Sequence, residues 1–325
     1  MSGIIIGILQ SFQSNTIIME AKNDQVKGYA LITGGTSGIG YELAKCFAND
    51  GYNLILVARS EEGLQKTADE LKQQYKIEVK TLSKDLMVPG AAKEVYEYTQ
   101  SLSVTVDILV NDAGQGYWGK FVETDLNREI DLVHLNIIAL ISLTKYYLKD
   151  MVARGKGKIL QLASSLAKAP SPYMSVYAAS KAFVLSFNEA LTQELKDTGV
   201  TVTALQPGAT DTDFFHKAEA EETVEYRETS LYDPAEVAKA GYEGLMAGKD
   251  KVMPGIKNKL QGAMGTVLPD KAVAANMEKH LKESNKEDGR ERITHQQSAE
   301  ERERIDHQSG NKDGDVNEHQ GHVHE

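Results

Sequence analysis

The chain has 325 residues, of which 41% are hydrophobic, and this suits one large α/β domain with an appendage. Its net charge of −11 and pI near 5.3 disfavour a nucleic-acid partner, because the phosphate backbone requires a basic surface. Cys46 is the only cysteine, so the sequence excludes an intrachain disulfide and favours a reducing, cytoplasmic compartment.

The two ends of the chain differ in composition from its middle. Residues 1–26 begin with an apolar run, Gly3–Leu9, which is far shorter than the roughly 20 residues that span a bilayer. We expect a disordered extension there. Residues 282–325 are rich in charged residues, glutamine and histidine and predict a disordered tail. Its histidines fit a solvated low-complexity segment, so no metal site is predicted.

Between these ends, short β-branched runs alternate with longer helical patterns, which predicts βαβ units over residues 27–254. Strands are expected at 29–33, 53–58, 78–82, 107–110, 158–163, 200–206 and 251–253. Helices are expected at 39–50, 61–75, 89–102, 127–153, 174–196 and 234–246. The predicted fold is therefore α/β, with a doubly wound seven-stranded parallel sheet that binds ligands outside the carboxyl ends of its strands.

Residues 255–281 continue with apolar positions at helical spacing, from Ile256 to Leu268. This pattern predicts an amphipathic helical segment that packs against the body of the protein or a sister subunit. Attachment to a membrane surface is the less favoured alternative, because two or three lysines are a weak electrostatic anchor.

A glycine-rich turn follows the first expected strand, in the run Thr33-Gly34-Gly35-Thr36-Ser37-Gly38-Ile39-Gly40. Its spaced glycines permit a tight bend, a close backbone approach and packing of the next helix on the strand. The N-terminus of that helix would then point at a pyrophosphate.

A second motif pairs Tyr177 with Lys181. Residues four apart on a helix share a face, so the ammonium group can favour ionisation of the phenol. A phenol is otherwise too weak an acid to transfer protons near neutral pH. The pair therefore predicts acid–base chemistry beside the glycine turn.

Together these motifs resemble the short-chain dehydrogenase/reductase superfamily, and the resemblance covers about residues 28–254. It implies an oxidoreductase that interconverts a carbonyl compound and an alcohol by hydride transfer with NADP(H). By resemblance, Tyr177 is the proton donor, and Ser164, thirteen positions before it, binds the same oxygen, with Ser165 as the near alternative. Asn136 would hold a water molecule beside Lys181, which would also bind the nicotinamide ribose.

The cofactor contacts expected from the matched motifs follow the carboxyl ends of the strands. They are Gly34, Thr36, Ser37, Gly38, Ile39, Gly40, Arg59, Asp85, Leu86, Asn111, Ala113, Gly114, Tyr177, Lys181, Pro207, Gly208, Thr210 and Thr212. A preference for NADP(H) is expected at the second strand, where Ala58 replaces the carboxylate that would bind a ribose hydroxyl. Arg59 follows it and offers a charge-assisted contact to a 2′-phosphate.

One position departs from the family pattern. The fourth strand ends in Asn111-Asp112-Ala113-Gly114, where the family has a second asparagine in place of Asp112. A carboxylate still accepts backbone hydrogen bonds, so we expect a tolerated variant and assign Asp112 no catalytic role.

The substrate is less well specified. Phe214 to Glu228 is expected to form a lid, with a plain surface helix as the alternative. The loop 114–121 resembles that of a branch that includes long-chain 3-oxoacyl and 3-ketosphinganine reductases, and Tyr117, Trp118 and Phe215 suggest an apolar pocket. A small-molecule substrate and a homodimer or homotetramer are expected. The alternatives are an extended-type epimerase or dehydratase acting on a sugar nucleotide, and a non-catalytic NADP-binding sensor.

Overall fold

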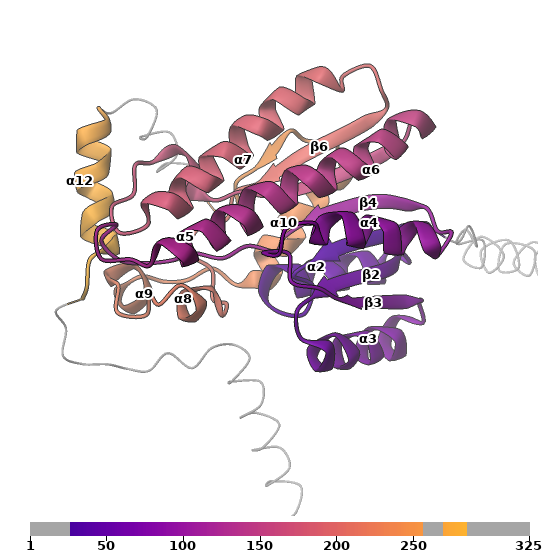
Figure 1. Ribbon diagram of the computed structural model, residues 1–325, viewed down its shortest axis with the longest axis horizontal. Coiled ribbons are helices and arrows are strands. Elements are labelled where there is room, and N and C mark those ends of the chain that lie inside the picture. The colour runs from indigo at the N-terminus through magenta and orange to yellow at the C-terminus, as the bar shows by residue number, and fades with distance from the viewer. Residues whose placement is uncertain (1–26, 256–268, 285–325) are drawn as a thin grey trace, which may run out of the picture.

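The computed structural model describes residues 27–255 and 269–284. Seven strands form one parallel sheet in the order β3-β2-β1-β4-β5-β6-β7 (Figure 1). They are β1 Tyr29–Thr33, β2 Asn53–Ala58, β3 Val79–Ser83, β4 Val106–Asn111, β5 Gly157–Leu162, β6 Val200–Leu205 and β7 Lys251–Val252. The predicted doubly wound parallel sheet is confirmed, and each predicted strand end agrees within one residue. The strand order reverses between β1 and β4, where ligands bind in such folds.

Helices cover both faces of the sheet. One hydrophobic cluster joins the sheet to α4 Ala91–Ser101, α6 Leu140–Arg154 and α7 Ser175–Glu194. The other joins it to α2 Gly38–Asn49, α3 Glu61–Tyr75 and α10 Pro234–Met246. Two of these helices, α3 and α10, begin at side-chain caps: Ser60 accepts a hydrogen bond from Gly63 N, and Asp233 accepts one from Ala235 N.

The helix predicted at 127–153 is interrupted. The structure has α5 Leu126–Val133, then the π-helical turn η1 His134–Ala139, then α6. A π turn carries one extra residue relative to an α-helix and changes which side chains face inward. Asn136 lies in this turn and is buried, whereas His134 is half-buried.

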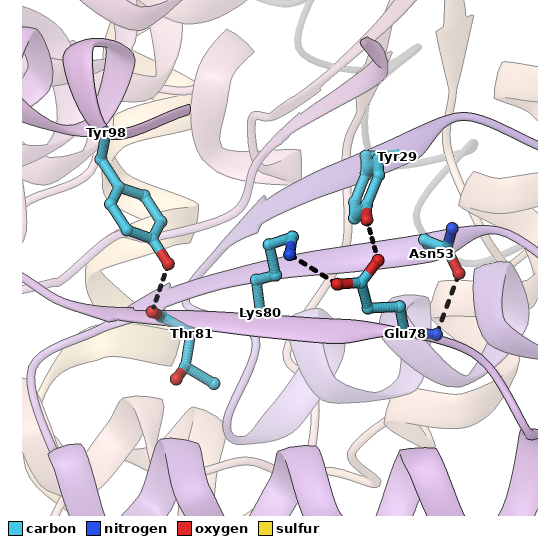
Figure 2. Close-up of polar contacts among 6 residues, drawn as sticks. All are labelled: Tyr29, Asn53, Glu78, Lys80, Thr81 and Tyr98. Atoms are coloured by element: carbon cyan, nitrogen blue, oxygen red, sulfur yellow. Dashed lines mark hydrogen bonds and ion pairs between the residues drawn. The ribbon is translucent and has the colours of Figure 1, made fainter. Parts of the chain in front are cut away.

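Polar contacts join the amino ends of the first three strands, opposite the edge where ligands bind (Figure 2). The Tyr29 hydroxyl and the Lys80 ammonium both donate to the Glu78 carboxylate, and Glu78 N donates to Asn53 Oδ1. Tyr98, from α4, donates to the carbonyl of Thr81. These contacts hold β3, the edge strand, to its neighbours.

The segment after β6 forms a cap on one end of the molecule. It contains α8 Phe214–Lys217 and α9 Val224–Glu228, and α12 Asp270–Leu281 lies beside them (Figure 1). The predicted apolar positions from Ile256 to Leu268 lie outside the described residues. The predicted tail began at residue 282, but the described chain reaches Ser284, and residues 282–284 pair with residues 222–224. The boundary of any tail therefore lies after residue 284.

Across the described ranges 27–255 and 269–284, no helix has both the length and the apolar composition needed to span a membrane.

Candidate active site

The glycine turn after β1 has the geometry that its sequence predicted. Gly34 and Gly38 adopt φ values of +75° and +55°, a region that favours glycine. A Cβ atom on Gly40 would overlap the Gly34 carbonyl oxygen and Asp112 Oδ2, so α2 can pack on the turn only with glycine there. Ser37 caps α2 by position but makes no side-chain capping hydrogen bond. Its hydroxyl and the N–H groups of Gly38 and Ile39, the first two residues of α2, suit an anion.

The ends of β1 and β4 are joined by Thr33. Its hydroxyl accepts hydrogen bonds from the backbone N–H groups of Asp112 and Ala113, at 3.2 and 3.1 Å. Asp112 in turn accepts a hydrogen bond from the Gly40 N–H, so its expected role as a backbone acceptor agrees with the structure. Burial raises the pKa of Asp112 to about 7, and the nearby Lys181 ammonium acts in the opposite direction. The position is thus a buried, titratable group at the switch point.

A cavity of about 640 Å³ runs from this turn along the carboxyl ends of the strands. Most of the predicted cofactor contacts line it: Gly34, Thr36, Ser37, Gly38, Ile39, Arg59, Asp85, Leu86, Ala113, Gly114, Tyr177, Pro207, Gly208, Thr210 and Thr212. Gly40, Asn111, Asn136 and Lys181 are not among the lining residues. The Asn111 amide instead donates to Thr144 Oγ1 and Gln161 Oε1 in the core, at 3.1 and 3.0 Å.

Tyr177 and Ser164 meet on the wall of the cavity. Ser164 follows β5, and Tyr177 lies in the first turn of α7. Both side chains are buried, and the Ser164 hydroxyl is placed where a hydrogen bond to the phenol lowers the pKa of Tyr177. The Ser164 hydroxyl also accepts a hydrogen bond from Leu166 N at 3.1 Å. Ser165 lines the cavity, but its described hydrogen bond is from its backbone N–H to the Pro207 carbonyl. The geometry therefore favours Ser164 over Ser165.

The electrostatics of the Tyr177–Lys181 pair differ from the expectation. Burial raises the pKa of Tyr177 to about 12, with the Ser164 hydrogen bond acting in the opposite direction. The Lys181 ammonium lies 5.8 Å from the Tyr177 ring centroid and donates to the Leu162 carbonyl at 2.8 Å. Burial also lowers the pKa of Lys181 to about 8, and Asp112 opposes this shift. In this structure Lys181 does not offset the burial of the phenol.

Asn136 uses its whole amide group in protein contacts. Its Oδ1 accepts a hydrogen bond from Gln115 N at 3.1 Å, and its Nδ2 donates to the Gln115 carbonyl and to Ser180 Oγ, each at 3.0 Å. The π-helical turn places it beside Gly114, where a Cβ atom would lie 3.3 Å from Asn136 Oδ1 and 3.2 Å from Lys181 Nζ. Asn136 thus fixes the loop after β4 next to Lys181.

The nucleotide end of the cavity contains two cations. Arg59 is exposed and forms no ion pair with any residue of the described ranges, whereas Lys84 is paired with Glu94 at 2.6 Å. Sequence reasoning missed Lys84, although its place directly after β3 was a usable signal. Glu61 and Glu62 lie in the first turn of α3, as expected from their position after the Ser60 cap.

The other end of the cavity is apolar. Phe214 and Phe215 line it, as the expected lid position implied, and the Phe214 ring lies 5.2 Å from that of Tyr177. Trp118 and Tyr117 belong to the same hydrophobic cluster but do not line the cavity. Two lining residues from α12, Met277 and Leu281, were not predicted. Their helical spacing was visible, but nothing in the sequence indicated where the helix docks.

The chain is similar to known proteins. A family model for short chain dehydrogenases matches residues 28–223. Very-long-chain 3-oxoacyl-CoA reductase of Anas platyrhynchos is 34% identical over 185 residues, which are 55% of this chain and 58% of that protein. This chain therefore covers 58% of the length of that relative.

Solved structures match a larger share of the chain. A short-chain dehydrogenase from Sphingobium yanoikuyae, in complex with NADPH, is 30% identical with a TM-score of 0.66, and the match covers 74% of this chain and 94% of that one. L-sorbose reductase from Gluconobacter frateurii, complexed with NADPH and L-sorbose, is 27% identical with a TM-score of 0.60, and the match covers 69% of this chain and 93% of that one. The motifs, the fold and the family match agree, and the chain belongs to the short-chain dehydrogenase family of oxidoreductases.

Proposed function

We propose that the protein interconverts a carbonyl compound and an alcohol by hydride transfer with NADP(H). One observation carries the proposal: the buried side chains of Tyr177 and Ser164 lie together on the wall of the same cavity that begins at the glycine turn. A proton donor and a dinucleotide-binding turn that share one cavity support a redox reaction at a carbon–oxygen bond.

The residues fit a dinucleotide. Gly38 has a φ of +55°, and a Cβ atom there would lie 3.0 Å from Thr212 Cγ2, so the turn needs glycine at this position. The N-terminus of α2 that follows suits a pyrophosphate. We assign the 2′-phosphate to Arg59, whose guanidinium group has no ion-pair partner in the described chain. The NADPH complexes of the two solved relatives support the same choice of cofactor. Thr212, from the turn after β6, would contact the nicotinamide carboxamide.

When bound, NADP(H) supplies or accepts the hydride. In the reducing direction Tyr177 donates its proton to the carbonyl oxygen, and Ser164 donates a hydrogen bond to that same oxygen. Because burial raises the pKa of Tyr177 to about 12, the phenol holds its proton until negative charge develops on the substrate oxygen. After the proton has moved, the single O–H of Ser164 can turn from the substrate oxygen to the phenolate that remains, since a hydrogen bond to the charged form favours it.

Lys181 and Asn136 are assigned positioning and binding roles, although neither side chain is among the residues that line the cavity. We assign Lys181 to the nicotinamide ribose, because its ammonium group lies beside Gly114, which lines the cavity. We assign the Asn136 side chain to the position of the Gln115 loop, because all three of its hydrogen bonds are made within the protein. The expected water relay through Asn136 stays a prediction.

The relatives guide the search for a substrate. The name of the Anas platyrhynchos protein and the loop 114–121 both support 3-oxoacyl thioesters as the first compounds to try. No observation favours the epimerase or sensor alternatives, and the relatives compared above are named as reductases and dehydrogenases.

The test is NADPH oxidation, followed by absorbance, with a panel of 3-oxoacyl thioesters, 3-keto acids, steroid ketones and small aldehydes. We expect turnover with at least one class, and loss of that turnover in Tyr177→Phe while NADPH binding, measured by calorimetry, is kept. NADPH binding without turnover of any carbonyl compound would support the sensor alternative instead. Absence of NADPH and NADH binding would refute the proposal.

A further inference from the structure

The C-terminal helix forms part of the cavity wall. Val273, Met277 and Leu281 are the buried residues of α12, and they share one face of the helix because they are spaced four apart. They pack in a cluster that includes Tyr177 and Phe215. Met277 and Leu281 also line the cavity that contains Ser164 and Tyr177. Met277 and Leu281, about 100 residues after Tyr177 in the sequence, therefore lie at the end of the cavity that contains Tyr177 and Ser164.

Several contacts hold α12 in this place, and we call them the clasp. The Trp118 indole N–H donates to the Leu281 carbonyl at 2.7 Å. Val224 N donates to the Lys282 carbonyl at 3.1 Å, and Ser284 N donates to the Glu222 carbonyl at 2.7 Å. The clasp therefore ties α12 to the loop after β4 and to the segment that leads into α9.

A further side-chain contact lies beside the clasp on the side of α9. His280 Nδ1 lies 3.1 Å from Glu225 Oε2, and Glu225 also lines the cavity. This contact places the Glu225 side chain next to α12.

The chemistry of this end is different from that of the nucleotide end. Leu166, Met174, Phe214, Phe215, Met277 and Leu281 supply the apolar part of the lining. A substrate whose carbonyl oxygen meets Tyr177 and Ser164 must direct one substituent toward these side chains. Desolvation of that substituent favours a hydrocarbon over a charged or hydroxylated group.

We propose that Met277 and Leu281 determine substrate specificity by closing the apolar end of the cavity, so that the enzyme selects carbonyl compounds with an apolar substituent of limited length. The inference rests on the proposed carbonyl reduction. It assigns to α12, on this chain, a role in the choice of substrate and none in hydride or proton transfer. Enlarging Met277 should shorten the accepted substituent, and reducing it should lengthen it.

The experiment compares Met277→Ala and Met277→Phe with wild type on a homologous series of straight-chain ketones or 3-oxoacyl thioesters at saturating NADPH. A pocket contact of one or a few methylene groups changes kcat/KM by roughly 10- to 200-fold. We therefore expect Met277→Ala to lower kcat/KM for the preferred length by about 10-fold or more and to move the preference to longer compounds. Met277→Phe should move it to shorter ones. The KM for NADPH should stay unchanged in both.

The matched control is Asn276→Ala, on the exposed side of the same helix, which should keep the wild-type preference. If Met277→Ala has a much lower melting temperature than wild type, Leu281→Met is the conservative second variant. It keeps an apolar side chain beside the clasp and should shift the length preference by less than Met277→Ala would.

An unchanged length preference across the series in both folded Met277 variants would overturn the inference while leaving carbonyl reduction intact.

A binding measurement separates this inference from the proposed function. Trp118 is the only tryptophan of the chain, and its indole is bonded to Leu281. Without cofactor, a series of apolar alcohols should change Trp118 emission in wild type with a length dependence that Met277→Ala moves to longer alcohols. If no carbonyl compound is reduced but this shift is seen, the inference about the apolar end is supported and the proposed carbonyl reduction is refuted. Emission that responds to no alcohol in the series counts against the apolar end.

Discussion

Asp112 allows a quantitative test, because its carboxyl group is buried where the family motif has an amide. The change Asp112→Asn removes the titratable group and leaves an amide oxygen to accept the Gly40 N–H. Burial raises the pKa of Asp112 from 3.8 to about 7, so over this interval the folded chain keeps a proton that the unfolded chain has released. The free energy of unfolding of the wild type therefore contains a contribution that is full below the unfolded pKa and is lost as pH rises to about 7.

The size of the effect follows from the shift. A shift of about three pKa units at 1.36 kcal/mol each gives a largest loss of about 4 kcal/mol. Two cations face the carboxyl group, Lys181 from α7 and Lys217 from α8, and the side chain of Lys217 is 48% exposed. Burial lowers the pKa of Lys181 to about 8, and without Asp112 it should fall further. This second effect also raises the free energy of unfolding of the variant relative to that of the wild type as pH rises.

The assay is urea unfolding of wild type and Asp112→Asn at several pH values between about 4 and 7.5, because contributions from groups that do not interact with residue 112 cancel in the difference. We expect the stability of the variant relative to wild type to rise by at most about 1.4 kcal/mol per pH unit. Asp131→Asn, on the exposed surface, is the control and should give a constant difference. A constant difference for Asp112→Asn as well would refute the reasoning.

Four further predictions concern the cofactor, the proton donor and the C-terminus. Tyr177→Phe should lower kcat by roughly two to four decades, the scale of general acid catalysis, while NADPH affinity measured by calorimetry is kept. Ser164→Ala should lower kcat in the same assay, and Ser165→Ala should leave it near wild type; equal losses would contradict the Ser164 assignment. Arg59→Ala should raise the KM for NADPH by about one to two decades and leave that for NADH nearly unchanged, because one charge-assisted contact contributes about 1.5–3 kcal/mol. Removal of residues 285–325 should keep Tm and kcat/KM, whereas a cut that also removes residues 282–284 should lower Tm by a few degrees, since about 1 kcal/mol shifts Tm by 2–4 °C in domains of this size.

Much of the nucleotide end could be predicted because its determinants are local. The turn from Gly34 to Gly40 connects consecutive elements, and its glycines have steric reasons that the sequence alone suggests. The thirteen-residue spacing between Ser164 and Tyr177 could also be used, because β5 and α7, which position the two residues, follow each other in the chain. In both cases the partners lie close in the chain, so the sequence pattern carries the geometry.

The remainder depends on packing that the sequence does not display. Asn111 was expected at the cofactor, but its amide points into the core, because Thr144 and Gln161 offer buried partners from other elements. The raised pKa of Tyr177 follows from burial, which is a property of the assembled cap. Met277 shows the same limit, since the helical pattern predicts an apolar face but not the cavity that this face closes.

The hydrogen bond between Trp118 and Leu281 joins residues 163 positions apart, and this has a consequence for the order of folding. Closing so long a loop carries an entropic cost that the sheet contacts between neighbouring βαβ units do not share. We therefore expect the clasp to form after the sheet and to open before it, as a separate local unfolding unit. In hydrogen exchange, the amides of α12 should exchange well before those of the central strands, so the substrate end of the enzyme would open while its nucleotide end stays folded.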